Sequence, residues 1–349
     1  MLLWPHMLSR HRLALAACLT ALNACGTQAG TAVPHAAEGP PIAESARVSL
    51  GADTISILGW GEATFGRIQG LLDGARRSIH LEMYEFGRED LATALTRAHD
   101  RGVAVTVIVD PSVLQTAGMA TRLRAAGLDV LEYPVRARMI DHVKLLIVDG
   151  DVAVAGGINW GAQSQLNHDF DAVLSGPVVA NLDRVFVRDL VTSGRRQQLP
   201  DAVADAALLV VTTGPGPDIR PLALALLDNA RRSIDMEQFV LTDTGIVHSL
   251  ISAHRRGVAI HLLLDPDQRP SDGPAATLRA AGIDVRLYGG GGKLHAKAAV
   301  ADDRTVLFGS ANWTNSGFQH NHEVDIEVVD STAVAATFLQ HMAADRGTG

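Results

Sequence analysis

This chain of 349 residues contains only two cysteines, and it carries no excess of positive charge. The two cysteines, Cys18 and Cys25, both lie near the N-terminus, so the rest of the chain has no disulfide, thiol nucleophile or cysteine-ligated metal. The 30 basic residues are outnumbered by 38 acidic ones, and the net charge is −8. This balance argues against a general duplex-DNA binder, which usually carries a broad basic face, but it allows a small positive site.

The apolar run at 13–22 is too short to span a bilayer, which takes about 20 residues. It follows two arginines, and this order is typical of an export signal, so we predict a signal peptide over 1–25. The sequence around Cys25 resembles a bacterial lipobox, in which Asn23 is an unusual residue. Lipidation of Cys25 and ordinary cleavage both remain open. Export to the cell envelope or secretion is expected in either case.

After a predicted flexible linker at 26–50, rich in Ala, Gly, Pro and Thr, the sequence repeats itself. The recurring segments, each offset by 155 positions, are 71–79 with 226–234, 98–104 with 253–259, and 123–127 with 278–282. A repeat of this length indicates duplicated domains rather than a solenoid. We predict a first repeat at 51–200 and a second at 201–349.

Each repeat alternates helical and strand patterns. In the first repeat the predicted helices are 65–77, 90–101 and 116–126, and the predicted strands are 78–86, 103–109, 128–133 and 152–155. Glycine follows the second and third of these helices, as is common at helix ends. This order predicts an α/β layered fold.

Lysine is as scarce as cysteine: Lys144, Lys293 and Lys297 are the only lysines among 30 basic residues. Two of them belong to the pattern His-x-Lys-x-x-x-x-Asp, which occurs once in each repeat. The copies are His142, Lys144 and Asp149, and His295, Lys297 and Asp302. A chain that otherwise uses arginine retains lysine where a compact point charge suits the ligand better than a planar fork. A phosphate contacted by one ammonium from each repeat is the natural candidate.

On a strand, alternate side chains share a face, so each motif should present one imidazole beside one ammonium. The following segments 156–159 and 309–312 are rich in glycine and add Asn159, Ser310 and Asn312 as candidate substrate-binding residues. Such a set suits a phosphodiester, with one imidazole attacking phosphorus and the other protonating the leaving oxygen. A carboxylate that orients each imidazole would complete the site. Asp169 and Glu323 follow the two histidines by 27 and 28 positions.

Several other residues favour structural roles. Asp149 and Asp302 open hairpin turns, and the two tryptophans Trp160 and Trp313 are typical of core packing. The remaining histidines of interest are scattered and lack a tight carboxylate cluster; they are His99, His254, His261, His320 and His322. We therefore predict no metal site and no cofactor.

The doubled His-x-Lys-x-x-x-x-Asp motif and the Gly-Ser-x-Asn segment resemble the phospholipase D superfamily over roughly 55–330. The resemblance implies two duplicated α/β/α sandwich units packed about a pseudo-twofold axis, with one shared, metal-independent site. It also implies a phosphohistidine on His142 and general acid catalysis by His295. Lys144, Lys297 and the two asparagines would hold the phosphate, and Asp169 and Glu323 would support the histidines.

One residue departs from the family pattern: Gly157 stands where serine is usual, as is also seen in sequences similar to cardiolipin synthases. The expected function is that of a phospholipase D-type phosphodiesterase or phosphatidyltransferase, a monomer acting on phospholipid at a membrane surface. Two alternatives stay open, a secreted nuclease and a catalytically inactive phosphate-binding protein of the envelope. Nucleic acid is the less favoured partner because of the acidic charge balance.

Overall fold

The first repeat forms an eight-stranded mixed sheet in this computed structural model, which describes residues 43–214 and 219–348. In spatial order the strands are β1 (Val48–Leu50), β2 (Asp53–Leu58), β9 (Asp171–Ser175), β7 (Val152–Gly156), β6 (Lys144–Val148), β3 (Ser78–Met83), β4 (Ala104–Val109) and β5 (Asp129–Glu132). Strands β3, β4 and β5 run parallel, and the other neighbours pair antiparallel.

The second repeat forms a seven-stranded sheet of the same design. Its strands, in spatial order, are β10 (Leu208–Thr212), β17 (Val324–Val328), β16 (Thr305–Gly309), β15 (Lys297–Ala301), β11 (Ser233–Gln238), β12 (Ala259–Leu264) and β13 (Asp284–Leu287). A separate two-stranded pair joins β14 (Lys293–Leu294) to β8 (Asn167–His168). Short 3-10 turns occupy Ser164–Leu166 and Arg269–Ser271.

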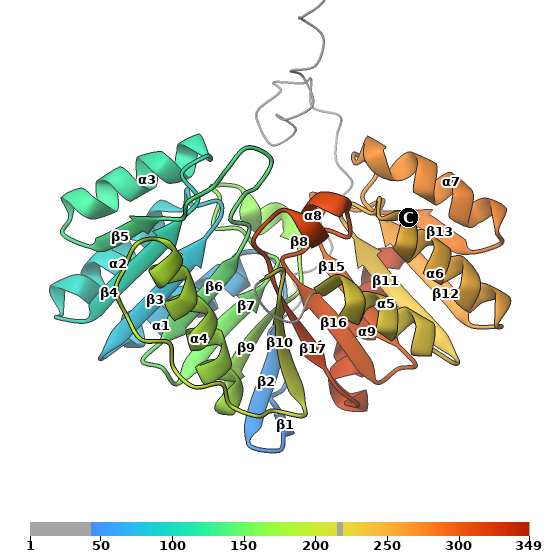
Figure 1. The fold of residues 1–349 in the computed structure, drawn as a ribbon, viewed down its shortest axis with the longest axis horizontal. Coiled ribbons are helices and arrows are strands. Elements are labelled where there is room, and N and C mark those ends of the chain that lie inside the picture. The colour runs from blue at the N-terminus through green and yellow to red at the C-terminus, as the bar shows by residue number, and fades with distance from the viewer. Residues whose placement is uncertain (1–42, 215–218, 349) are drawn as a thin grey trace, which may run out of the picture. The chain divides into compact units, whose positions relative to one another are not determined.

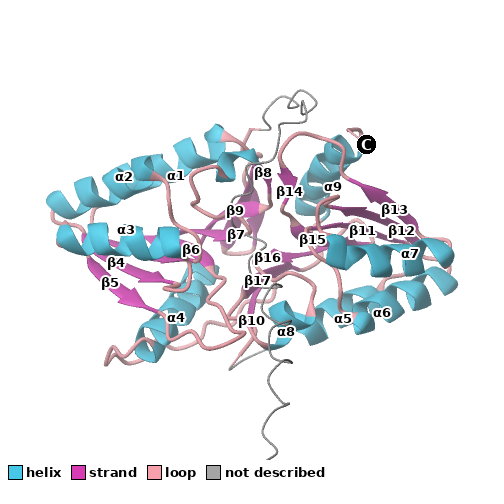
Figure 2. Cartoon of the chain, turned by 90° about the horizontal axis from the view of Figure 1, so that it is seen from above, coloured by secondary structure: helices cyan, strands magenta, loops and turns pink. Residues whose placement is uncertain are grey.

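Helices cover both faces of each sheet (Figures 1 and 2). The outer helices are α1 (Glu62–Gly74), α2 (Glu89–Asp100) and α3 (Leu114–Ala125) in the first repeat, and α5 (Ile219–Asn229), α6 (Thr244–Arg255), α7 (Asp272–Ala280) and α8 (Asn315–Gln319) in the second. On the inner faces, α4 (Pro177–Thr192) and α9 (Thr332–Arg346) contribute to one central apolar core with strands of both sheets. Each repeat also has its own outer core. The predicted pair of α/β/α units is therefore confirmed.

The internal repeat is visible in the element bounds. Strands β3 and β11, helices α2 and α6, and strands β4 and β12 each begin 155 positions apart. The predicted helix at 65–77 is placed three residues too late, since α1 ends at Gly74. The reason is that an extended connection at 75–77 leads into β3, where Asp149 binds the backbone of these residues.

The predicted linker at 26–50 is wrong at its C-terminal end, because Val48–Leu50 forms β1 and pairs with β2. The predicted signal peptide at 1–25, including Cys25, lies outside the described residues, as does most of the linker. Within the part of the chain that the structure describes, no helix combines the length and apolar character needed to cross a membrane.

Candidate functional site

The two motif lysines begin two corresponding strands, β6 and β15, at the centre of the molecule. Val143, Leu145 and Ile147 face the central core, as strand alternation predicts, and Lys144 points to the opposite face. His142 differs from the prediction, because it precedes β6 instead of lying on it. Its backbone N–H donates to the carbonyl of His322, in the other repeat, at 2.8 Å.

Each motif histidine is held by a carboxylate from the other repeat. His142 Nδ1 lies 2.9 Å from Glu323 Oε2, and His295 Nδ1 lies 2.9 Å from Asp169 Oδ2. All four side chains are buried. The sequence predicted the two carboxylates but not their exchange between repeats. Because each pair needs both repeats, neither repeat contains a complete site on its own.

Short backbone pairings produce this exchange. Strand β8, at Asn167–His168, runs parallel to β14, just before His295. In the other direction, His322 forms a parallel bridge with Asp141, just before His142. The carboxylate that follows each bridge is thereby placed beside the histidine of the opposite repeat.

The two lysines are buried near one another and near the histidines. Lys144 Nζ donates to the carbonyl of His142 at 2.6 Å, and Lys297 Nζ donates to the carbonyl of His295. Burial lowers the pKa of Lys144 to about 7, against the attraction of Glu323, and the charge of Lys297 lowers it further. Burial also lowers the pKa of Lys297, which Asp169 partly opposes. Two desolvated ammonium groups side by side would be stabilised by a bound anion.

The surroundings of both motif histidines favour neutral imidazoles. Burial lowers the pKa of His142 well below its ordinary value, and the neighbouring charges of Lys144 and Lys297 act in the same direction. Burial also lowers the pKa of His295 to about 4, even though Asp169 opposes the shift. A neutral imidazole whose Nδ1–H is held by a carboxylate presents an Nε2 lone pair, as a nucleophile requires.

The two carboxylates differ in their surroundings. Burial raises the pKa of Glu323 to about 7, although Lys144 and a hydrogen bond from Ser310 Oγ at 2.6 Å favour its charged form. For Asp169 burial alone would raise the pKa, but the interaction with His295, including the hydrogen bond at Nδ1, and the charge of Lys297 outweigh it and lower the pKa.

Gly157, the departure from the family pattern, is explained by the shorter carboxylate beside it. A Cβ atom at Gly157 would lie 2.4 Å from Asp169 Oδ1, which leaves no room for a serine without movement. In the second repeat Ser310 occupies the equivalent place and donates to the longer Glu323. The two repeats therefore fill equivalent space with different pairs, Asp169 with Gly157 in one and Glu323 with Ser310 in the other.

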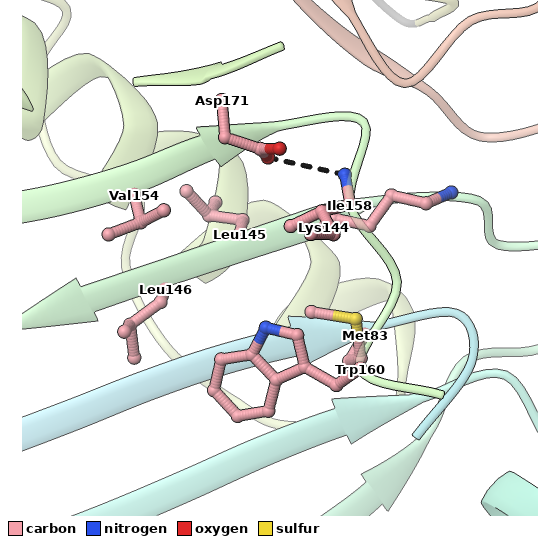
Figure 3. Close-up of a pocket in the computed structure, with 8 residues that line it drawn as sticks. All are labelled: Met83, Lys144, Leu145, Leu146, Val154, Ile158, Trp160 and Asp171. Atoms are coloured by element: carbon pink, nitrogen blue, oxygen red, sulfur yellow. Dashed lines mark hydrogen bonds between the residues drawn. The ribbon is translucent and has the colours of Figure 1, made fainter. Parts of the chain in front are cut away.

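The asparagines are placed beside the site, but Asn159 is already engaged. Its Nδ2 donates to Glu85 Oε2 at 3.1 Å, while Asn312 lies on the equivalent loop of the second repeat. Figure 3 shows how Asp171 anchors the first loop through the N–H of Ile158, at 3.2 Å, beside a cavity of about 10 Å³. This cavity has room for one water at most, so it is not the substrate site. Trp160, which lines it, is buried, as is Trp313.

The motif aspartates lie at the turns that follow the motif strands and bind backbone. Asp149 accepts N–H groups from Arg76, Arg77 and Ser78 at 2.6–3.1 Å. Asp302 accepts the equivalent three donors in the second repeat. Both have positive φ angles, and their carboxylates tie the turn to the start of the neighbouring strand.

The expectation that no carboxylate cluster accompanies the scattered histidines is wrong for His322. Among the described residues, Glu82, Asp141 and His322 bring potential ligand atoms within 4.8 Å of one another, and all three are buried. These residues are far apart in the sequence, so spacing gave no signal for them.

An apolar cavity of about 750 Å³ lies beside β10. Its lining comes from α4, the following loop, β10 and α5, and includes Leu199, Val203, Val210, Leu222, Arg184 and Arg188. Thr213 directly follows β10, and its hydroxyl accepts the N–H of Glu323 at 3.1 Å.

Sequence reasoning missed three further groups around the histidines. Asn321 Nδ2 donates to Glu323 Oε1 at 3.0 Å. The ring of Tyr84 lies 4.8 Å from that of His142, and the ring of Phe239 lies 4.7 Å from that of His295. Tyr84 and Phe239 are 155 positions apart, so an aromatic residue after the same strand in both repeats was a usable signal.

Comparison with known proteins agrees with this geometry. The family model described as "Cardiolipin synthase, PLD-like domain" matches twice, at 68–190 and 223–346. Cardiolipin synthase from Geobacillus kaustophilus is 28% identical over 318 residues, which cover 80% of this chain and 63% of that protein. Cardiolipin synthase A from Pseudomonas putida is 28% identical over 332 residues, covering 85% of this chain and 69% of the relative. The chain thus spans less than two thirds of the first relative and slightly more of the second.

A solved structure supports the fold. The crystal structure of phosphatidylserine synthase from Haemophilus influenzae Rd KW20 superposes with a TM-score of 0.67 at 14% identity, covering 84% of this chain and 85% of that one. The two family matches together span well over half of the sequence, one in each repeat. The chain therefore belongs to the phospholipase D superfamily, within the family of cardiolipin synthase PLD-like domains.

Proposed function

We propose that this protein is an exported enzyme that transfers the phosphatidyl group of a phospholipid to an alcohol or to water through a phosphohistidine. The observation that carries the proposal is the pair of buried, exchanged histidine–carboxylate contacts beside two buried lysines. One imidazole with a free lone pair, a second imidazole and two ammonium groups are the parts that a double displacement at a phosphodiester requires.

In the first step His142 Nε2 attacks phosphorus. A nitrogen–phosphorus bond forms, the bond from phosphorus to the leaving oxygen breaks, and His295 Nε2–H gives its proton to that oxygen. Glu323 holds Nδ1–H of His142 and stabilises the positive charge that the ring acquires. Lys144 and Lys297 neutralise the charge on the non-bridging oxygens.

In the second step His295 takes a proton from an incoming alcohol or water, whose oxygen attacks phosphorus. The nitrogen–phosphorus bond breaks and His142 returns to its neutral form. An alcohol yields a new phospholipid, whereas water yields a phosphatidic acid. The same group therefore acts first as acid and then as base.

His295 must be protonated for the first step, although burial and Lys297 lower its pKa. The phosphodiester brings a negative charge into contact with the lysines, which raises the pKa of a neighbouring imidazole. Asp169 favours the same protonation, because it accepts the hydrogen bond at His295 Nδ1 and its own pKa is lowered. Binding of substrate thus prepares the acid.

Lipid is favoured over nucleic acid for two reasons. The net charge of −8 opposes the long-range attraction on which nucleic-acid binders depend. The cavity along β10 is lined mainly by apolar side chains, so it suits an acyl chain. The names of the relatives in the family point to the same substrate class. We extend this to a monomer acting at a membrane surface of the cell envelope, reached through the N-terminal signal.

The test is incubation of the purified protein with vesicles of mixed phospholipids, with and without glycerol, and separately with single-stranded DNA. We expect new phospholipid with glycerol, phosphatidic acid without it, and intact DNA. Cleaved DNA with unchanged lipid would establish the nuclease alternative. Binding of phosphate without turnover of any substrate would establish the inactive alternative.

A further inference from the structure

A cluster of buried ionisable groups lies beside the proposed catalytic site and shares no residue with the phosphate-binding set. It consists of Glu82 on β3, Asp141 before β6, Asp189 on α4 and His322 before β17. Their exposed fractions are 0%, 0%, 1% and 3%. We call these four residues the carboxylate cluster.

Three residues of the carboxylate cluster, Glu82, Asp141 and His322, bring potential ligand atoms close together, and Asp189 contacts His322. His322 Nε2 lies 2.9 Å from Asp189 Oδ2 and 3.9 Å from Glu82 Oε1. Potential ligand atoms of Glu82, Asp141 and His322 all lie within 4.8 Å of one another. Ligands bound to zinc at 2.0–2.1 Å in a tetrahedron are separated by about 3.3 Å, so the atoms would move together by about 0.6 Å between His322 and Glu82 and by at most about 1.5 Å for the widest pair.

Three oxygens of the cluster have no donor. Within the described residues, both carboxylate oxygens of Glu82 and Oδ2 of Asp141 lack a hydrogen-bond partner. Burying a carboxylate without a partner is costly, so such oxygens indicate a missing positive group. Burial raises the pKa of Glu82 well above its ordinary value, and the neighbouring charge of Asp141 raises it further.

The charges of the cluster indicate the size of the missing charge. Three carboxylates are opposed by Arg188, whose Nε lies 3.3 Å from Asp189 Oδ1, so two negative charges remain if His322 is neutral. Asp110 lies next to Asp141 and adds to the negative potential, but its oxygens already accept donors from Ser112 and Asp141. Either one divalent cation or two protons would balance the cluster.

The equivalent arrangement beside the second motif provides an internal comparison. Glu237, His168 and Asp345 stand at the positions equivalent to Glu82, His322 and Asp189, but Leu294 replaces the equivalent of Asp141. There, His168 Nδ1 contacts Asp345 at 2.7 Å and Nε2 contacts Tyr288 Oη at 3.0 Å, so both ring nitrogens are engaged. Although the Glu237 oxygens also lack donors among the described residues, no third ligand from residues 43–214 or 219–348 converges with them.

We propose that the carboxylate cluster binds one divalent transition-metal ion, Zn²⁺ or Mn²⁺, through Glu82, Asp141 and His322, with Asp189 beside His322. An imidazole nitrogen with carboxylate oxygens is a donor set that suits these ions. The ion would join β3 and the segment before β6 of the first repeat to the segment of the second repeat that carries Glu323. Its role is to fasten the two repeats, and it takes no part in the phosphoryl chemistry proposed above.

The test compares two matched glutamine variants of the full chain. Wild type, Glu82→Gln and Glu237→Gln are each incubated with Zn²⁺ or Mn²⁺, desalted, and measured by elemental mass spectrometry and thermal unfolding. We expect one ion per chain and a higher Tm with metal in the wild type and in Glu237→Gln. Glu82→Gln should lose the ion and the metal-dependent rise in Tm, since an amide replaces the carboxylate without leaving an unpaired charge.

Absence of bound metal in the wild type, with no change of Tm, would overturn the proposal in favour of a proton-sharing network. Equal binding by Glu82→Gln and wild type would overturn it too. If Glu82→Gln does not fold, Asp141→Leu replaces it, because leucine reproduces the second repeat at this position. Loss of the ion in Asp141→Leu supports the proposal, and retention refutes it. The result is independent of phospholipid turnover, so it stands or falls separately from the proposed function.

Discussion

The exchange of carboxylates between repeats predicts that each repeat controls the histidine of the other. The test is a matched pair of neutral substitutions, Glu323→Gln and Asp169→Asn. In the structure Glu323 Oε2 accepts from His142 Nδ1, and Oε1 accepts from Asn321 Nδ2. Oε2 also accepts from Ser310 Oγ, so a glutamine at 323 cannot satisfy all three donors, and with its carbonyl toward Asn321 its NH₂ faces His142. His142 would then carry its proton on Nε2, the atom that must attack phosphorus.

The expected magnitude follows from these contacts. Loss of a buried hydrogen bond to a charged group is worth about 1.5–3 kcal/mol, or roughly 10–150-fold in rate. The wrong tautomer adds to this, and the comparable change in a serine protease triad lowers kcat by about 10⁴. We therefore expect Glu323→Gln to slow formation of the phosphohistidine by between about 10² and 10⁴.

The assay uses a nitrophenyl phosphodiester, whose leaving group needs no proton. The initial burst of nitrophenolate reports formation of the phosphohistidine, and the steady rate reports its breakdown. Glu323→Gln should lose the fast burst. Asp169→Asn should keep the burst and slow the steady rate, because it disturbs the base of the second step. The reverse pattern would show that each carboxylate serves the histidine of its own repeat. An unchanged burst in both variants would show that the two contacts support the structure and do not affect formation of the phosphohistidine.

Three further predictions follow from individual contacts. Lys144→Arg or Lys297→Arg should each lower kcat about 100-fold or more, because the larger guanidinium misplaces a preorganised charge in a fully packed site; near-normal turnover would refute this. Gly157→Ser should reduce activity by displacing Asp169, and the double variant with Asp169→Glu should regain it, as steady-state kinetics would show. For Asp149 burial raises the pKa, but three backbone donors outweigh it and lower the pKa below its ordinary value. The stabilisation is thus present at neutral pH and lost as pH falls through that pKa, so Asp149→Asn should cost about 1 kcal/mol at pH 7 and progressively less in acid, as measured by denaturant unfolding.

The sequence predicted the parts of the fold that depend on local pattern. The 155-residue offset, the strands at β3 and β4, and the inward face of Val143, Leu145 and Ile147 follow from periodicity, which neighbouring residues determine. The predicted bounds of α1 were three residues too late, because the segment after the helix is bound by Asp149, more than 70 positions away.

The sequence predicted which residues form the candidate site, but not which of them contact one another. The sequence named His142 and Glu323, yet only the packing of the two repeats brings residues 181 positions apart into contact. The reason for Gly157 was likewise hidden, since it depends on the position of the Asp169 side chain. The cluster around Glu82 and His322 had no signal in the sequence, because its members come from four segments that are far apart along the chain.

Mass spectrometry of rapidly quenched protein tests the central claim most directly. Wild type, His142→Asn and His295→Asn are mixed with a nitrophenyl phosphodiester, quenched in alkali, digested and searched for phosphorylated peptides. The account predicts an adduct on the peptide that contains His142, which accumulates in His295→Asn because the base for its release is missing, and no adduct in His142→Asn. An adduct on the peptide that contains His295 and never on that of His142 would reverse the two roles. Turnover by the wild type with no adduct in any of the three proteins would contradict the covalent mechanism and indicate direct attack by water.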